Sequence, residues 1–257
     1  MIFLLSGEGK TDLGYCKVGG KPYDSGIYRY GPMAVLVDKL VYKKTEISIL
    51  ENSIISFISE TALKDISNNS SKKRSMRLAG KKQKKETTFF ANNAHALATK
   101  AKEIERKENE TVIAILFRDS DGTRSSPRSL WQDKWDSMIQ GFERAGYSTG
   151  VPMIPCPKSE VWLLCAVKEN PYNHCDKLEK ISSGNDKSPK PLKDQLDNAC
   201  QKFFSKNKEY RHKKSYSAED WNNILKDDEI DIHRIDMPSF NTFKEHLYTI
   251  LQDCSPD

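Results

Sequence analysis

The hydrophobic pattern of the chain begins with short apolar runs that are separated by polar turns. Three runs have the length and composition of buried strands, namely residues 2–5 (IFLL), 111–117 (TVIAILF) and 150–154 (GVPMI). Apolar runs of this kind are typical of parallel strands, because helices cover both faces of a parallel sheet.

Stretches with helical periodicity alternate with these runs. Residues 47–58 have features of both a strand and a helix, and we leave them unassigned. Residues 14–30 are rich in glycine and residues 68–85 are polar and basic, so we expect loops there. Apolar residues recur every three or four positions in four predicted helices, at residues 32–42, 89–106, 130–145 and 159–167.

This order of elements predicts an α/β fold. Strands that alternate with helices favour a central, mostly parallel sheet flanked by helices, and a helical C-terminal extension follows it. The chain has 257 residues, 37% apolar and 30% charged, which fits one large core with an insertion. We expect that core over residues 1–168, with a basic insertion near residues 68–86, and a mostly helical region over residues 169–257.

The cysteines and the hydropathy of the chain indicate where in the cell the protein is found. The six cysteines show neither a C-x-x-C motif nor zinc-finger spacing, so we expect free thiols in a reducing compartment. No run approaches the roughly 18 to 20 apolar residues of a membrane span, and the run at residues 1–5 is too short for a signal peptide. Together these features predict a cytoplasmic protein without a membrane partner.

Positive charge is concentrated in one stretch. The 41 Lys and Arg exceed the 36 Asp and Glu, which gives a net charge of +5. The basic block at residues 72–85 is either a solvated tract or a site for a polyanion. The same alternatives apply to residues 211–214 (RHKK). Eight basic residues without an acid between them are candidate nucleic-acid contacts: Lys72, Lys73, Arg74, Arg77, Lys81, Lys82, Lys84 and Lys85.

Residues 6–12 (SGEGKTD) contain a G-K-T triplet directly after the first apolar run. A phosphate-binding loop requires G-x-x-x-x-G-K-S/T, but Leu4 stands where its first glycine should be. The loop is therefore too short, and Glu8 would place a carboxylate among the phosphate oxygens. As the turn after a strand, the stretch instead offers Glu8 as a ligand for a hard cation or as a proton acceptor.

A second acidic element, Asp119-Ser120-Asp121, follows the apolar run at residues 111–117. In an extended chain Asp119 and Asp121 point the same way, so both carboxylates can converge on one magnesium ion, which prefers oxygen ligands. A solvated turn is the alternative interpretation.

A third element, residues 157–164 (PKSEVWLL), follows the run at residues 150–154. Glu160 lies in the first turn of the predicted helix, where the helix dipole favours a carboxylate whether or not it has a function. We expect Trp162, Leu163 and Leu164 to be core residues, and Lys158 either to meet a phosphate or to face solvent.

Together these motifs resemble the Toprim fold of type IA topoisomerases, bacterial primases and the overcoming-lysogenization-defect (OLD) nucleases. The resemblance rests on residues 8–12 (EGKTD) and 119–121 (DSD), and residues 157–164 are similar to a stretch of OLD-like and RloB-like Toprim proteins of bacterial anti-phage defence. It covers about residues 1–168. The glycine-rich residues 13–31 and the basic block depart from the family pattern, and no ATPase like that of OLD nucleases is visible.

The resemblance implies a site for phosphodiester chemistry that depends on Mg²⁺ or Mn²⁺. Glu8 would be a general base or metal ligand, Asp119 and Asp121 would be metal ligands, and Glu160 would complete a second metal site. Lys10 and Asp12 would assist in the same turn. Two metals can stabilise the attacking and the leaving oxygen.

The function expected from the resemblance is metal-dependent hydrolysis of DNA or RNA by an effector of anti-phage defence. The alternative is a catalytically silent or regulatory Toprim-like subunit that binds a partner ATPase or a phage protein, with Trp221, Phe240 and Phe243 as contact residues. The chain is too short for a topoisomerase gate, and no primase module is visible. The sequence leaves open DNA or RNA, one or two metals, and whether the chain forms a homo-oligomer.

Overall fold

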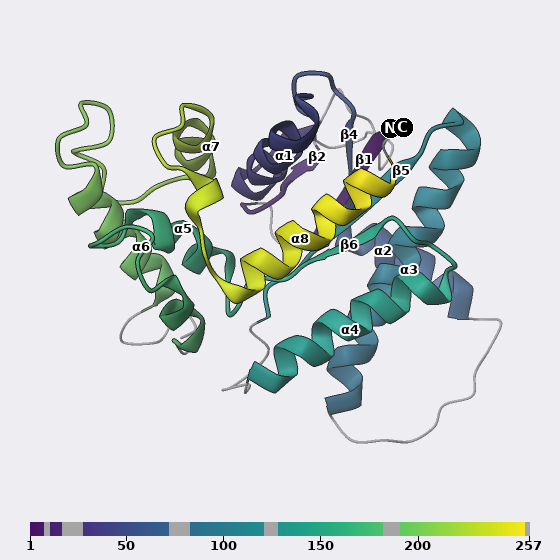
Figure 1. The fold of residues 1–257 in the computed structure, drawn as a ribbon. Coiled ribbons are helices and arrows are strands. Elements are labelled where there is room, and N and C mark those ends of the chain that lie inside the picture. Colours follow the sequence, from purple (N-terminus) through teal and green to yellow (C-terminus); the bar gives the residue numbers. More distant parts are fainter. Residues whose placement is uncertain (8–10, 17–27, 72–82, 121–127, 182–190, 255–257) are drawn as a thin grey trace.

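The computed structural model of the chain is built on a four-stranded, all-parallel sheet (Figure 1). It describes residues 1–7, 11–16, 28–71, 83–120, 128–181 and 191–254. The strand order is β4-β1-β5-β6, and its strands are β1 (Ile2–Gly7), β4 (Ile55–Ser59), β5 (Val112–Phe117) and β6 (Gly150–Met153). The predicted α/β fold with a parallel central sheet and C-terminal helices is confirmed.

Helices flank this sheet and form the C-terminal third of the chain. Among the described residues no helix is long and apolar enough to cross a membrane. The α-helices are α1 (Pro32–Thr45), α2 (Glu60–Ser71), α3 (Gln83–Glu108), α4 (Arg128–Arg144), α5 (Ser159–Val167), α6 (Leu192–Phe203), α7 (Ala218–Lys226) and α8 (Pro238–Asp253), and two short 3-10 helices are η2 (Cys175–Lys180) and η3 (Ile232–Arg234).

The central strands are buried because their sequences are apolar on both faces. All six side chains of β5 are buried, and in β1 only Ile2 is partly exposed. The two strands pair in parallel from Ile2 opposite Val112 to Gly7 opposite Phe117. Their carboxyl ends therefore lie side by side, and the segments that follow Gly7 and Phe117 leave from the same edge of the sheet, here called the carboxyl edge.

The chain connections make this edge a place where a ligand can bind. From β1 the chain continues through α1 to β4 on one side, and from β5 through α4 to β6 on the other. Because such crossovers are right-handed, α1 and α4 cover opposite faces of the sheet. In Figure 1, α8 runs beside α1 along the near side of the strands, and α2, α3 and α4 are grouped apart from them. The ends of β1 and β5 thus form the topological switch point at which α/β sheets bind ligands.

Three predicted loop or unassigned segments contain regular structure. Residues 14–30 include an antiparallel pair, β2 (Gly14–Cys16) and β3 (Tyr28–Tyr30). Gly14 has a φ of +103°, and a Cβ atom there would lie 2.0 Å from the carbonyl oxygen of Arg29, so this hairpin requires glycine. The expected loop at residues 68–85 is helical at both described ends, in α2 and α3, and residues 47–58 contain β4.

The C-terminal helices complete the core rather than extending away from it. The buried Trp162 ring of α5 stacks on Phe243 of α8 with ring centroids 5.9 Å apart, and its Nε1 donates to Ser239 Oγ at 2.9 Å. Phe240 and Phe243 are fully buried and Trp221 is 5% exposed. Phe240 and Phe243 are therefore packed within the chain and do not form the expected partner surface, whereas Trp221 lines a pocket that is described below. The boundary at residue 168 stays a prediction.

The expectation of free thiols is wrong for one pair of cysteines. Cys165 near the end of α5 forms a disulfide with Cys175 at the start of η2. The chain turns back between them, and Tyr172 N–H donates to the carbonyl of Cys165 at 2.9 Å. Sequence spacing does not encode this turn. The side chains of Cys156, Cys200 and Cys254 are thiols.

Candidate active site at the carboxyl edge

Ser159 joins the three motifs that the sequence singles out. Its Oγ donates a hydrogen bond to Asp12 Oδ1 at 2.6 Å, and its backbone N–H donates to Asp119 Oδ1 at 3.0 Å. Asp12 follows β1, Asp119 follows β5, and Ser159 is the first residue of α5. Segments that are far apart in the sequence therefore meet at the switch point, with one serine between two carboxyl groups.

The turn after β5 is held by backbone contacts rather than by strand pairing. Ser120 N–H lies 3.1 Å from the carbonyl oxygen of Pro155 and 3.0 Å from that of Pro157. The ammonium group of Lys134, which is 1% exposed, donates to the carbonyl of Ser120. β5 ends at Phe117, so the expectation that strand alternation aligns Asp119 with Asp121 does not apply to Asp119. Its carboxyl group faces the first turn of α5 instead.

The local electrostatics suit carboxyl groups at this place. The first N–H groups of α5 have no partner within the helix, and the positive end of its dipole favours the carboxylate of Asp119. Burial raises the pKa of Asp12, while hydrogen bonds from Ser159 and Thr11 and the charge of Lys158 work in the opposite direction. Asp12 therefore keeps its proton to a higher pH than an exposed aspartate does.

A pocket of about 270 Å³ opens beside these groups and is here called the edge pocket. Asp12, Ser159 and Glu160 line it from the carboxyl edge. The opposite wall is formed by Asp197 of α6, by Tyr216 just before α7 and by Trp221 in the first turns of α7. Glu160 thus shares a cavity with Asp12, and helices of the C-terminal third close the site.

A second ionic group at the carboxyl edge was not expected from the sequence. Arg118 follows β5, and its Nη1 lies 3.3 Å from Oε1 of Glu60, the residue that follows β4. The guanidinium also lies 4.3 Å from the ring centroid of Phe89. Burial acts to raise the pKa of Glu60, but Lys64 and Arg118 outweigh it and hold that pKa below its usual value. The only signal for this ion pair in the sequence is that each of its two charged residues directly follows a strand.

Most of the other predicted site residues lie outside the described part of the chain. Glu8, Lys10 and Asp121 lie outside the described residues, as do Lys72, Lys73, Arg74, Arg77, Lys81 and Lys82. Lys84 and Lys85 belong to the backbone of α3, but their side chains are outside the description. Within the described ranges no group of three or more His, Cys, Asp or Glu is arranged to hold a metal ion. Asp119 and Glu160 therefore supply only part of the predicted set of oxygen donors.

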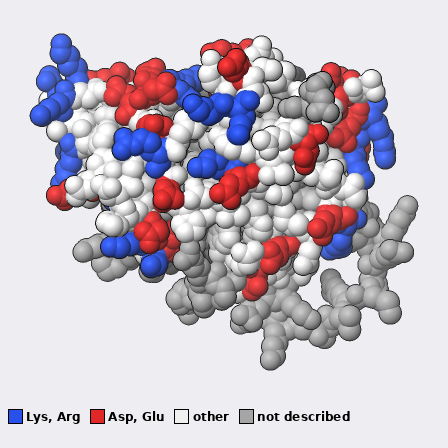
Figure 2. Space-filling view, viewed as in Figure 1, with Lys and Arg blue, Asp and Glu red and all other residues white. Residues whose placement is uncertain are grey.

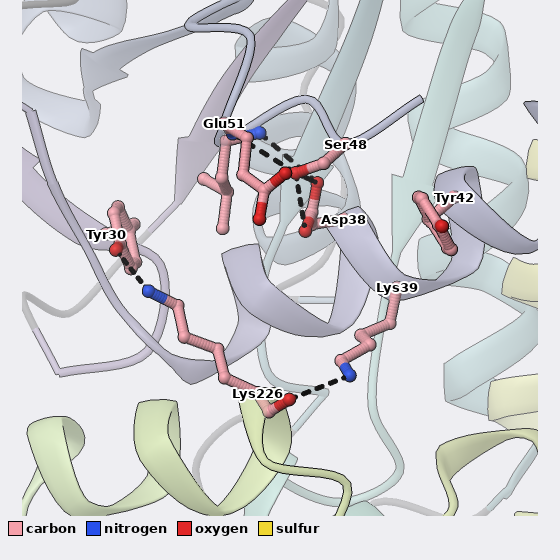
Figure 3. Close-up of a pocket in the computed structure, with 8 residues that line it drawn as sticks. Tyr30, Asp38, Lys39, Tyr42, Ser48, Glu51 and Lys226 are labelled. Carbon is pink, nitrogen blue, oxygen red and sulfur yellow. Dashed lines mark hydrogen bonds between the residues drawn. The ribbon is translucent and has the colours of Figure 1, made fainter. Parts of the chain in front are cut away.

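A second pocket, of about 390 Å³, lies between α1 and the last residue of α7 and is here called the α1 pocket (Figure 3). Asp38 of α1 accepts hydrogen bonds from Ser48 Oγ at 2.9 Å and from the N–H of Ile49 at 2.6 Å. Lys39 Nζ donates to the carbonyl of Lys226 in α7 at 3.2 Å. Figure 3 shows Asp38 turned towards Ser48 and Lys39 turned towards Lys226. Lys39 thus fastens α7, the helix that carries Trp221 in the edge pocket, to α1, whereas Asp38 holds the turn that follows α1.

Comparison with known proteins finds no match to the chain among family models, curated proteins or solved structures. The functional assignment of the carboxyl edge accordingly depends on its own residues and their geometry.

Proposed function

We propose that the chain is a metal-dependent nuclease of Toprim type, which hydrolyses phosphodiester bonds of DNA or RNA at the carboxyl edge. The observation that carries this proposal is the double hydrogen bond of Ser159 to Asp12 and Asp119. It brings the segments after β1 and β5 and the start of α5 to one point. The order of the acidic motifs along the chain, which resembles Toprim nucleases, supports the same assignment.

The donor chemistry of these residues fits magnesium or manganese. Asp119 and Glu160 offer carboxylate oxygens, the ligand type that hard divalent cations prefer, and Glu8 and Asp121 would complete the set. When bound, such an ion lowers the pKa of a water molecule and neutralises charge on the phosphate.

The protein's own groups orient the site and limit its flexibility. Ser159 fixes the carboxyl groups of Asp12 and Asp119 through two short hydrogen bonds. Lys134 fixes the turn that carries Asp119. Glu8 is proposed as the general base, because it directly follows the central strand β1.

The wider assignment belongs to the same proposal. We propose a cytoplasmic effector of anti-phage defence that contacts nucleic acid through the basic residues 72–85 and works alone or with a separate ATPase. The competing assignment is a silent or regulatory subunit that binds such an ATPase or a phage protein.

The test is cleavage of single- and double-stranded DNA and RNA by the purified chain with Mg²⁺, with Mn²⁺ and with a chelator. We expect cleavage with either metal and none with the chelator. Glu8→Gln should lower the rate by about 10²- to 10⁴-fold, and Asp119→Asn should also lower it strongly. Asp65→Asn, an exposed carboxylate on α2, is the matched control and should cleave as the unchanged chain does.

Two outcomes would count against the proposal. Equal cleavage by the unchanged chain, Glu8→Gln and Asp119→Asn would show that the catalytic residues are wrongly assigned. Absence of cleavage from every substrate with both metals would favour the regulatory subunit, which a pull-down with separately encoded ATPases would then examine.

A further inference from the structure

We propose that the edge pocket binds one unpaired nucleobase that carries an exocyclic amino group, such as cytosine or adenine, beside the phosphate that is cleaved. This inference rests on the proposed nuclease function and names the substrate class of the same site. It assigns the wall formed by α6 and α7 to substrate recognition, a role that the acidic motifs do not provide.

The size of the edge pocket limits how large a bound group can be. Its volume of about 270 Å³ is just below the range of about 300–1,000 Å³ that is usual for small-molecule sites. One base fits a space of this order, whereas a base pair within a duplex does not. Enzymes that take a base into such a pocket act on single strands or extrude the base from the stack. The substrate strand must therefore be unpaired at this position.

The chemistry of the pocket wall at α6 limits which base can bind. Asp197 lines the pocket, and its Oδ1 accepts the backbone N–H of Tyr216 at 3.1 Å. A carboxylate held in this way can accept further hydrogen bonds but cannot donate any. It matches an exocyclic amino group, as in the pairing of Asp or Glu with cytosine N4. With Asp12 and Glu160 on the opposite side, the lining has three carboxyl groups against one ammonium group, that of Lys193, and therefore favours a hydrogen-bond donor over a phosphate group.

Burial around Asp197 strengthens this match. Burial raises the pKa of Asp197, and the N–H of Tyr216 and the charge of Lys193 act in the opposite direction. A partly desolvated carboxyl group of this kind gains more from a hydrogen-bond donor than one in water does.

Aromatic side chains supply the third feature. Tyr216 and Trp221 line the pocket and are 6% and 5% exposed, with their ring centroids 6.2 Å apart. Contact of a base with an aromatic side chain stabilises binding of single strands without regard to sequence. The aromatic pair would therefore hold the base, and Asp197 would select among bases.

Basic side chains near the pocket offer contacts for the phosphate backbone. Residues 202–214 run from the end of α6 to just before Tyr216, and Figure 2 shows Lys and Arg side chains, interspersed with Asp and Glu, at the upper left over this part of the molecule. The exposed basic residues of this segment are Lys202, Lys206, Lys208, Arg211 and Lys214. A basic segment beside an aromatic pocket is the arrangement with which proteins bind single strands.

The experiment measures binding in the presence of a chelator, so that no cleavage is needed. Labelled oligonucleotides of about 12 residues are titrated with the full chain, with oligo(C) compared against oligo(U), and oligo(dC) against oligo(dU). Cytosine and uracil differ at position 4, where an amino group replaces a carbonyl oxygen, and at N3, which accepts a hydrogen bond in cytosine and donates one in uracil. We expect the C oligomers to bind about five- to tenfold more tightly than the U oligomers, and the matching duplexes to bind more weakly than either.

Two variants test whether Asp197 causes the preference for C over U oligomers. Asp197→Asn should abolish or reverse it, because the amide can donate to the O4 of uracil. Asp194→Asn changes an exposed carboxylate in the first turn of α6 and should leave the preference intact. The thermal midpoint of each variant is measured alongside, and if Asp197→Asn does not fold, the comparison of C with U on the unchanged chain decides.

The proposal is overturned by equal binding of C and U oligomers, by a preference that survives Asp197→Asn, or by tighter binding of duplex than of single strand. Its failure is distinct from that of the nuclease function. Metal-dependent cleavage without a base preference would defeat only the pocket assignment, whereas a base preference without cleavage would defeat only the nuclease assignment.

Discussion

Lys134 is the residue whose environment is least expected from its type. It is 1% exposed, its ammonium group donates to the carbonyl of Ser120, and it lies 5.5 Å from the ring centroid of Phe90. Buried lysines are rare unless their charge is compensated. Its hydrogen bond to the Ser120 carbonyl indicates that it holds the segment carrying Asp119, and so acts on the site through the backbone.

Lys134→Met should lower both stability and activity. The methionine keeps most of the packing but leaves the Ser120 carbonyl without its donor, at a cost of about 1–3 kcal/mol in the free energy of unfolding. If the chain is a nuclease, displacement of the turn should also reduce cleavage by about 10- to 100-fold. Chemical denaturation and single-turnover cleavage measure the two effects.

Lys102→Met is the matched control, because Lys102 Nζ donates to the carbonyl of Ala145 at 2.6 Å on another part of the molecule. It should lose stability without a specific loss of cleavage. Equal cleavage by both variants would show that Lys134 has only a structural role.

At the residue scale, sequence reasoning located the site but not its internal contacts. Asp119 and Glu160 were identified because acidic residues after apolar strands are conspicuous, and both lie at the described carboxyl edge. Ser159, Lys134 and Arg118 were missed as site residues. Their roles depend on which segments meet in space, and neither periodicity nor spacing encodes that.

At the scale of elements, α7 illustrates how local sequence fixes a wall of the edge pocket. Ser217 accepts the N–H of Asp220 and Asp220 accepts the N–H of Ser217, which is a complete capping box. Lys213 also pairs with Asp220. Burial acts to raise the pKa of Asp220, but the hydrogen bonds from Lys213 and Ser217 outweigh it and hold that pKa below its usual value.

Asp220→Ala should therefore destabilise the protein in a pH-dependent way. At neutral pH we expect a loss of about 0.5–2 kcal/mol, as for other helix caps. Because the folded pKa lies below the unfolded value, the contribution of Asp220 is complete above about pH 4 and fades as the pH falls through the folded pKa. Urea unfolding of both chains from neutral pH towards about pH 3 measures the difference.

Glu219→Ala is the control, since Glu219 is exposed in the same first turn. It should cost less than about 0.5 kcal/mol. A loss for Asp220→Ala that does not shrink on acidification would contradict the assigned role of its carboxylate.

Most elements were predictable because their sequences carry strong periodic signals. The predicted strand at residues 111–117 corresponds to β5 and the helix at 159–167 corresponds to α5. The hairpin of β2 and β3 was missed because strands of three residues are too short to show alternation. β4 was left unassigned because residues 47–58 show features of both a strand and a helix, and the turn that Asp38 anchors before β4 is a contact that only the folded chain creates.

At the scale of the whole molecule, the sequence predicted the α/β class but not how its two parts associate. The apolar runs require a parallel sheet covered on both faces, and the structure has one. Nothing in the pattern indicated that α8 would pack on α1 and β6, or that α6 and α7 would close the edge pocket. Such contacts between distant segments depend on the complementarity of side chains, for which one sequence gives no signal.

The packing of α8 predicts that the whole chain unfolds as one unit. Phe243 is fully buried against Trp162 of α5, so Phe243→Ala should remove about 3–5 kcal/mol from the free energy of unfolding. If α8 belongs to the core, tryptophan fluorescence and far-ultraviolet circular dichroism should report the same transition, and the substitution should shift both together. Glu245→Ala, on the exposed side of α8, should shift neither. Two separate transitions, with only the first moved by Phe243→Ala, would instead show that residues 169–257 form an independent domain, as the sequence pattern suggested.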